Sequence, residues 1–399
     1  MKTFPYITLA ALLAAVPVRA AEGLPPDFEL VQTAPAETDL ADPALRSAAD
    51  VWAELFDRAG QYIDIEQFYV TLKDGEPTDR VVAALKRAGE RGVRIRFLIE
   101  KKFEKNSAES LPALKAIPNL ELRILEFSKV KDDGIIHAKF IVVDGREAYV
   151  GSQNFDWRAL KHIHEMGLRT TEPSVAAGAD AVFEHDWKAA GLLAEGKPVP
   201  ALRTEPVAAS TSARAVLVAS PWAFDPDGVG DSQGELVRLI GTAESDLEIQ
   251  LLNYAPLTRK KRFYPPLDNA LREAAARGVR VRLLVSHWNT DKPGVDWLKS
   301  LDLVPGVEVR VITVPAAKEG FIPFARTAHS KYMVVDGKTL WLGTSNWEGG
   351  YLDNSRNLEL VVREPALAAQ ARAVHQRLWG SAYTAPLDAA KDYPAVKKG

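Results

Sequence analysis

Histidine and lysine occur two residues apart at two places in this 399-residue chain, and both places have the same surroundings. The first copy reads His137-Ala138-Lys139, followed by Asp144 and then by Gly151-Ser152-Gln153-Asn154. The second reads His329-Ser330-Lys331, followed by Asp336 and then by Gly343-Thr344-Ser345-Asn346. Corresponding positions are all 192 residues apart. Together the copies supply two imidazoles, two ammonium groups and two amides, which is what phosphodiester chemistry without a metal would need.

A phosphodiester is an anion that repels nucleophiles, so its cleavage needs positive and hydrogen-bonding groups around the phosphate. We expect the non-bridging oxygens to be held by Lys139, Lys331, Asn154 and Asn346. One imidazole is expected to attack phosphorus and form a covalent phosphohistidine. The other is expected to protonate the leaving oxygen and then to activate the incoming water or alcohol. The residues alone do not decide which of His137 and His329 has which role.

Each histidine should also have a carboxylate behind its second ring nitrogen, to fix the tautomer and to stabilise the imidazolium. The candidates are Glu165, 28 residues after His137, and Glu359, 30 residues after His329. Both lie in apolar, strand-like segments, where a carboxylate without a partner is costly. The other members of the two strings are expected to be structural, since Asp before a glycine turn commonly bonds nearby backbone: Asp144, Asp336, Ser152 and Thr344.

We expect no metal and no cofactor. Each motif histidine has a lysine neighbour that would repel a cation, and no cluster of His, Asp or Glu has the spacing of metal ligands.

The elements that must position these residues are strands. A His and a Lys two apart on an extended chain point to the same face, and the apolar runs 140–143 and 332–335 predict buried strands after each pair. The repeat is wider than the motifs, because residues 90–99 match 276–285, each a helix ending at glycine and followed by a strand. Strands alternating with helices predict an α/β fold.

Residues 196–215 are rich in Pro, Ala, Ser and Thr and are expected to link two halves. We therefore predict two similar domains, 21–200 and 201–399, each a mixed β-sheet flanked by helices, packed with pseudo-twofold symmetry around one shared site. The alternative is two tandem domains with separate sites. The residues after Pro386 are expected to form a polar tail.

The first 20 residues predict a secretory signal. Lys2 precedes an apolar run over residues 7–16, and Val18-Arg19-Ala20 suits cleavage after Ala20. Because the run is too short to span a bilayer, we expect a periplasmic or secreted protein without a stable membrane anchor. The absence of cysteine excludes disulfides and a lipid-modified cysteine. The net charge of −3 does not by itself mark a nucleic-acid binder.

The doubled string of His-x-Lys, Asp and Gly-Ser/Thr-x-Asn resembles the phospholipase D superfamily, and the resemblance covers essentially the whole chain after residue 20. It implies two α/β domains packed face to face around one metal-free site, with His137 as nucleophile and His329 as general acid and base. Residues 153–160, 322–326 and 344–347 are similar to the endolysosomal branch, whose members act as exonucleases on single-stranded DNA and RNA from the 5′ end. Those relatives are membrane-anchored and carry disulfides, whereas this chain has no cysteine. The resemblance therefore implies an exported cousin.

One further segment favours a nucleic-acid substrate, because basic residues with aromatic neighbours can contact phosphates and stack a base: Arg259, Lys260, Lys261, Arg262, Phe263 and Tyr264. Trp157, Trp288 and Trp347 lie near the motif segments and are candidates for lining a pocket. We predict a metal-independent phosphodiesterase, an exported 5′-exonuclease-like nuclease on single-stranded nucleic acid. The alternative is a phospholipase D or transphosphatidylase on glycerophospholipids, which needs an interfacial apolar surface that the sequence does not offer convincingly. A remote alternative is a non-catalytic phosphate-binding protein, which intact His and Lys pairs disfavour.

Overall fold

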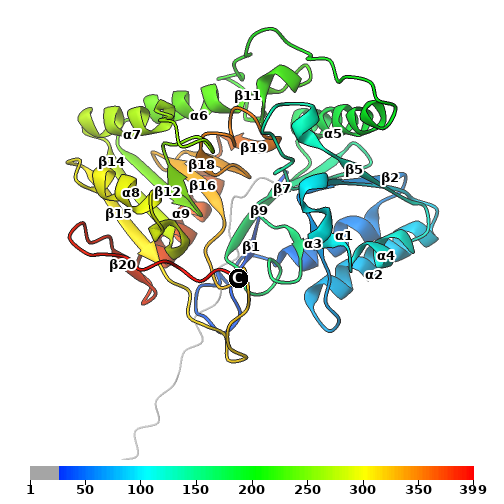
Figure 1. Cartoon of the computed structure of the whole chain (residues 1–399), viewed down its shortest axis with the longest axis horizontal. Coiled ribbons are helices and arrows are strands. Elements are labelled where there is room, and N and C mark those ends of the chain that lie inside the picture. Colours follow the sequence, from blue (N-terminus) through cyan, green and yellow to red (C-terminus); the bar gives the residue numbers. More distant parts are fainter. Residues whose placement is uncertain (1–26) are drawn as a thin grey trace, which may run out of the picture.

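Two β-sheets with helices around them make up the fold (Figure 1). The computed structural model describes residues 27–399, so the predicted signal segment lies outside the described residues. The first sheet has the order β1-β9-β7-β6-β2-β4-β5. Its strands are β1 (Phe28–Thr33), β2 (Tyr62–Gln67), β4 (Arg94–Glu100), β5 (Leu120–Leu125), β6 (Phe140–Val143), β7 (Glu147–Gly151) and β9 (Glu165–Thr170). Its longer helices are α1 (Ala48–Arg58), α2 (Pro77–Glu90) and α5 (Pro173–Ala194), with the short α3 (Glu104–Ser107) and α4 (Leu111–Lys115).

The second sheet has the order β11-β10-β19-β17-β16-β12-β14-β15-β20. Its strands are β10 (Ala215–Ser220), β11 (Gly230–Asp231), β12 (Asp246–Leu251), β14 (Arg280–Ser286), β15 (Val307–Ile312), β16 (Lys331–Val335), β17 (Thr339–Gly343), β19 (Asn357–Val362) and β20 (Thr384–Pro386). Its helices are α6 (Ser232–Gly241), α7 (Pro266–Ala276), α8 (Gly294–Asp302) and α9 (Pro365–Trp379). Two small sheets pair β3 (Val70–Thr71) with β8 (Phe155–Asp156) and β13 (Tyr254–Ala255) with β18 (Trp347–Glu348).

The same six-strand order occurs in both sheets. The run β9-β7-β6-β2-β4-β5 in the first half corresponds to β19-β17-β16-β12-β14-β15 in the second. This correspondence confirms the predicted α/β fold with two similar halves.

Local sequence explains the matching units that precede the motifs. Helix α2 starts with a proline in its first turn, buries Val81 and Leu85 on one face, and is followed by Gly92 at φ 88°, a value that favours glycine. Strand β4 then pairs in parallel with β2 and β5. Its residues 95–100 are buried, because a parallel strand is covered on both faces. Helix α7, Gly278 (φ 93°) and β14 repeat this arrangement.

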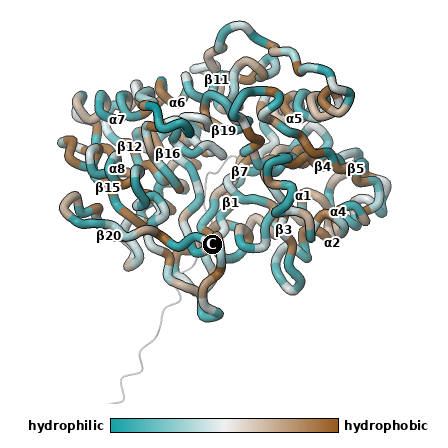
Figure 2. Tube along the Cα trace, viewed as in Figure 1, coloured by the Kyte–Doolittle hydropathy of each residue, from teal (hydrophilic) through white to brown (hydrophobic). Residues whose placement is uncertain are grey.

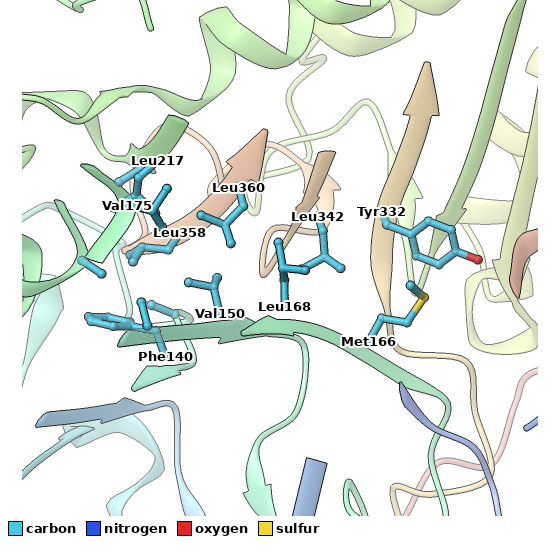
Figure 3. Close-up of a cluster of buried hydrophobic side chains, with 14 of the residues drawn as sticks. Phe140, Val150, Met166, Leu168, Val175, Leu217, Tyr332, Leu342, Leu358 and Leu360 are labelled. Atoms are coloured by element: carbon cyan, nitrogen blue, oxygen red, sulfur yellow. The ribbon is translucent and has the colours of Figure 1, made fainter. Parts of the chain in front are cut away.

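Hydrophobic side chains from both sheets form one core between them (Figure 3). Phe140, Val150 and Leu168 of the first half lie in the same cluster as Leu342 and Leu360 of the second. Each half has a further core of its own beneath its outer helices, and hydrophobic stretches accordingly follow the strands around β4 and β5 (Figure 2). Burial of each such side chain stabilises the fold by roughly 1.5–3 kcal/mol, so the halves are fixed relative to each other.

Among residues 27–399, no helix is both long enough and apolar enough to cross a membrane.

Candidate active site

Each His-x-Lys pair is held by the backbone of the opposite half. The backbone N–H groups of His137 and Ala138 donate to the carbonyl of Arg356, at 2.8 and 2.9 Å. In the mirror arrangement, His329 and Ser330 donate to the carbonyl of His164, at 2.8 and 3.1 Å. The anchoring residues directly precede β19 and β9. The two copies are therefore built into one site at the interface, rather than into two separate sites.

The two histidine rings have different partners. Nδ1 of His329 lies 2.9 Å from both carboxylate oxygens of Glu165. Nδ1 of His137 lies 2.9 Å from Oδ1 of Asn357. Each partner comes from the opposite half, so neither histidine is supported by the strand that follows its own motif.

The orientation of the Asn357 amide fixes the tautomer of His137. Its Nδ2 donates to the carbonyl of Tyr351 at 2.9 Å, and its Oδ1 accepts from Oγ1 of Thr344 at 2.9 Å. The atom that faces His137 is therefore an acceptor, so Nδ1 of His137 carries the hydrogen. Nε2 of His137 is left with a free lone pair.

The prediction that Glu359 supports a histidine is wrong. Its carboxylate instead accepts hydrogen bonds from Ser232 and Ser345. Glu359 pairs with Gly343 across β17 and β19. Its side chain packs over Gly343, where any side chain at position 343 would collide with it. The repeat carried the correct signal, because the position 192 residues after Glu165 is Asn357.

The phosphate-holding candidates converge on the same place. Lys139 and Lys331 are both 1% exposed, and each donates to the carbonyl of the histidine in its own motif. Asn154 and Asn346 are also buried, and the side-chain oxygen of each has no hydrogen-bond partner among residues 27–399. An amide oxygen only accepts hydrogen bonds, so it is the NH2 group of each asparagine that can donate to a phosphate oxygen.

The electrostatics of the site favour an anion. Burial lowers the pKa of Lys331 to about 7 and, helped by the charge of Lys331, lowers the pKa of Lys139 well below its usual value. Burial and the neighbouring lysines also hold the pKa of both histidines well below 6.5. Burial raises the pKa of Glu165 to about 8 against the opposing effect of the lysines. An incoming phosphate would supply the negative charge that these buried cations lack.

Both histidines and Asn154 open into a cavity of about 460 Å³. Five aromatic residues line it, Phe68, Tyr69, Phe103, Trp288 and Phe324, and the remaining wall is formed by Thr71, Asn106, Arg158, Ile163, Pro323 and Thr327. Of the three tryptophans that the sequence singled out, Trp288 lines this cavity, whereas Trp347 is buried in the core of the second half. Phe68, Tyr69 and Phe103 belong to no motif in the sequence, and only the fold shows that they line the same cavity as the histidines.

The remaining motif residues shape the backbone. Asp144 accepts from the backbone N–H groups of residues 60, 61 and 62, and Asp336 accepts from those of residues 244, 245 and 246. Ser152 accepts from the N–H of Met166 at 3.1 Å, and Thr344 accepts from the N–H of Leu358 at 3.1 Å. These contacts connect the motif turns to β9 and β19, the strands that begin with Glu165 and Asn357.

Part of the predicted substrate loop at residues 259–264 is occupied by contacts within the protein. Arg259 donates to the carbonyl of Asp133, and Lys260 pairs with the Asp133 carboxylate at 2.6 Å, so both connect the second half to the first. Tyr264 donates to Gln233, and Phe263 stacks on Trp297 with 5.4 Å between ring centroids. Lys261, Arg262 and Phe263 are the exposed members together with Lys260. Arg259, Lys260, Phe263 and Tyr264 thus have partners within the protein, and the substrate contact predicted for residues 259–264 stays a prediction.

Two exposed phenylalanines lie beside the cavity, where the sequence suggested no apolar surface. Phe321 is 51% exposed and the cavity-lining Phe324 is 54% exposed. Phe324 has a positive φ of 57°. Local propensity does not predict this conformation for phenylalanine.

Among residues 27–399, no group of three or more His, Asp or Glu side chains is arranged to hold a metal ion.

Comparison with protein families gives a match to a family described as "Cardiolipin synthase, PLD-like domain", over residues 53–187 and 236–379. Among curated proteins, phospholipase D Z of Dictyostelium discoideum is 32% identical over 373 residues, covering 86% of this chain and 86% of that protein. The 5′-3′ exonuclease PLD3 of Bos taurus is 31% identical over 408 residues, covering 92% and 82% respectively. A probable phospholipase D of Caenorhabditis elegans is 31% identical over 374 residues, covering 85% and 67%.

Among solved structures, the phosphatidylserine synthase of Haemophilus influenzae aligns with a TM-score of 0.63 at 14% identity, covering 90% of this chain and 87% of that one. At that identity the likeness concerns the fold.

Proposed function

This chain belongs to the phospholipase D superfamily and is a phosphodiesterase, and we propose that it hydrolyses single-stranded nucleic acid through a phosphohistidine intermediate. The observation that carries the mechanism is the unequal support of the two histidines. His137 faces a neutral amide and presents a free lone pair, whereas His329 faces a buried carboxylate. A lone pair suits a nucleophile, and a carboxylate partner suits a proton carrier.

In the first step, Nε2 of His137 attacks phosphorus and the bond from phosphorus to the leaving oxygen breaks. Because burial raises the pKa of Glu165 to about 8, the pair of Glu165 and His329 retains its proton at neutral pH. Nε2 of His329 can therefore carry a hydrogen and give it to the leaving oxygen. The two lysines and two asparagines hold the non-bridging oxygens while negative charge builds up on them.

In the second step, water attacks phosphorus and the bond between phosphorus and His137 breaks. Nε2 of His329, now without its hydrogen, takes a proton from the water as it attacks. The products are a phosphate monoester and an alcohol, and both histidines return to their starting states.

The aromatic walls of the cavity support a nucleic-acid substrate. Every base has a face that can stack on an aromatic ring, whatever the sequence, and five aromatic residues surround the histidines. The name of the Bos taurus relative, a 5′-3′ exonuclease, points the same way, and we extend the proposal to cleavage from the 5′ end. We also propose that residues 1–20 direct export, so that the enzyme works in the periplasm or outside the cell.

The exposed Phe321 and Phe324 favour a second candidate, a phospholipase D that meets its substrate at a lipid surface. One experiment compares the two candidates. Protein lacking residues 1–20 is incubated, with and without excess EDTA, with 5′-labelled single-stranded DNA and with phosphatidylglycerol vesicles. We expect cleavage of the DNA in both conditions, and none by the His137→Asn variant. Hydrolysis of the lipid alone would replace the nuclease with the phospholipase, and loss of activity in EDTA would contradict the metal-free mechanism.

A further inference from the structure

The last residues of the chain do not form the free polar tail that the sequence suggests. Residues 387–399, here called the C-terminal strap, run back across the second half after β20. Leu387 is buried, and its backbone N–H donates to the carbonyl of Val309 at 2.9 Å. Lys299 of α8 donates to the carbonyl of Lys391 at 2.7 Å. The strap is thus attached to the domain at these two points, while residues 388–392 are exposed.

The far end of the strap is fastened between two loops. The N–H of Val396 donates to Oδ1 of Asp291 at 2.8 Å, and Nζ of Lys398 lies 2.6 Å from Oδ2 of the same carboxylate. The N–H of Phe324 donates to the carbonyl of Lys398 at 2.5 Å. The segment around Lys398 therefore connects the loop of Asp291 to the loop of Phe324.

These loops carry aromatic walls of the active-site cavity. Asp291 directly follows the 3-10 turn His287–Thr290, which contains the cavity residue Trp288, and Phe324 lines the cavity itself. Nζ of Lys398 lies 5.9 Å from the centre of the Trp288 ring. Phe324 is held at a positive φ of 57°, which non-glycine residues rarely adopt, and the carbonyl of Lys398 helps to keep it there.

The strap also brings positive charge to the loop that carries the cavity residue Phe324. Lys397 is exposed, and its ammonium lies 4.2 Å from the centre of the exposed Phe321 ring. On the other side, Lys261, Arg259 and Lys398 all oppose the rise to about 7 that burial causes in the pKa of Glu348.

We propose that the C-terminal strap is a substrate-binding element, in which Lys398 and Asp291 fix the aromatic wall while Lys397 contacts the phosphates of a nucleic-acid strand outside the cavity. The inference rests on the proposed nuclease function. The strap would bind the part of the nucleic-acid strand beyond the bond being cleaved, because that part is a polyanion and must leave the cavity through its opening. A small phosphodiester that ends inside the cavity would not reach Lys397.

Two variants separate these roles, and a third is a matched control. Lys397→Gln removes the charge beside Phe321, Asp291→Asn weakens the fastening, and Lys391→Gln removes an exposed strap lysine that lies over Tyr393 instead. Each is assayed for kcat/KM on a 5′-labelled 20-nucleotide DNA and on bis(4-nitrophenyl) phosphate, over a series of salt concentrations.

For Lys397→Gln we expect a loss of about three- to tenfold on DNA at low salt, and a salt slope smaller by about 0.7, as for one lost contact to single-stranded phosphate. Its activity on the small diester should be unchanged. Asp291→Asn should raise KM for both substrates, because both use the aromatic wall, and Lys391→Gln should behave like the unmodified protein.

Unchanged rates and salt slope in Lys397→Gln would overturn the phosphate contact, and unchanged KM values in Asp291→Asn would overturn the fixing of the wall. Both results presuppose that the unmodified protein cleaves DNA. Absence of that cleavage would instead overturn the proposed nuclease function, and the strap proposal with it.

Discussion

The two halves share one backbone plan and differ in the side chains that meet the histidines. The carbonyls of His164 and Arg356 each accept two backbone N–H groups from the motif of the opposite half. The next residue in each case contacts the histidine of that motif. It is the carboxylate Glu165 for His329 and the amide Asn357 for His137. A duplicated fold thus places two equal histidines, and one position per half makes them chemically unequal.

The two anchors differ in the same way. Arg356 is fully buried and pairs with Asp186 of the first half and Asp225 of the second, at 2.7 and 2.8 Å. Its counterpart His164 is buried as a neutral ring, since burial lowers its pKa to about 3, and it contacts Ser330 and Gln32. One motif is therefore held by an ionic cluster and the other by neutral hydrogen bonds.

The different roles of the two histidines are tested most directly by replacing one histidine at a time. We expect His137→Asn and His329→Asn to lose at least about a thousandfold in steady-state turnover, because each removes a group used in both steps. On bis(4-nitrophenyl) phosphate, whose leaving group needs no proton, His329→Asn should still release about one equivalent of nitrophenolate in a rapid burst. His137→Asn should release none, and a burst from that variant would exchange the two roles.

The unequal anchors predict unequal losses of stability. Arg356→Met leaves two buried carboxylates without their partner and should lower the free energy of unfolding by about 3–5 kcal/mol. His164→Gln removes neutral hydrogen bonds and should lower it by about 1–3 kcal/mol. Urea denaturation followed by circular dichroism measures both, and equal losses would contradict an ionic clamp on one side only.

Exchanging the character of the two ring partners tests the division of labour itself. Glu165→Gln keeps an acceptor for His329 but removes the carboxyl group that shares a proton with its ring, so kcat on single-stranded DNA should fall about a hundredfold. Asn357→Asp places a carboxylate beside His137 and near the anionic substrate, and the loss should be nearer tenfold. The reverse ranking would assign proton transfer to His137.

The last prediction concerns the pH dependence that Lys331 gives to the site. A lysine with a lowered pKa is charged below that pKa and neutral above it. The pKa of Lys331 is about 7, so kcat/KM for an anionic substrate should decline by up to tenfold per pH unit above about 7. Lys331→Arg, which stays charged, should move this decline to higher pH, and a profile of kcat/KM against pH measures the shift. The same profile in both proteins would exclude Lys331 as the titrating group.

Much of the site could be predicted from the sequence because the duplication marks it. Two His, Lys and Asn sets at a fixed offset indicate which groups act, and Glu165 follows from its apolar surroundings. The error at Glu359 has a physical reason. Residues 357 and 359 lie on the same face of β19, and only the packing opposite Gly343 shows that the carboxylate bonds Ser232 and Ser345 while Asn357 reaches the histidine.

By itself, the sequence determined the candidate catalytic groups, the α/β units and the pairing of two similar halves, since these depend on residue types at short and regular spacing. The tertiary structure alone decided the crossed support of the histidines, the aromatic walls and the path of the strap. Those features join residues that lie far apart in the chain: His137 and Asn357 are 220 positions apart, and Asp291 and Val396 are 105 positions apart. No periodicity along a chain encodes such contacts, because they depend on which segments the tertiary packing brings side by side.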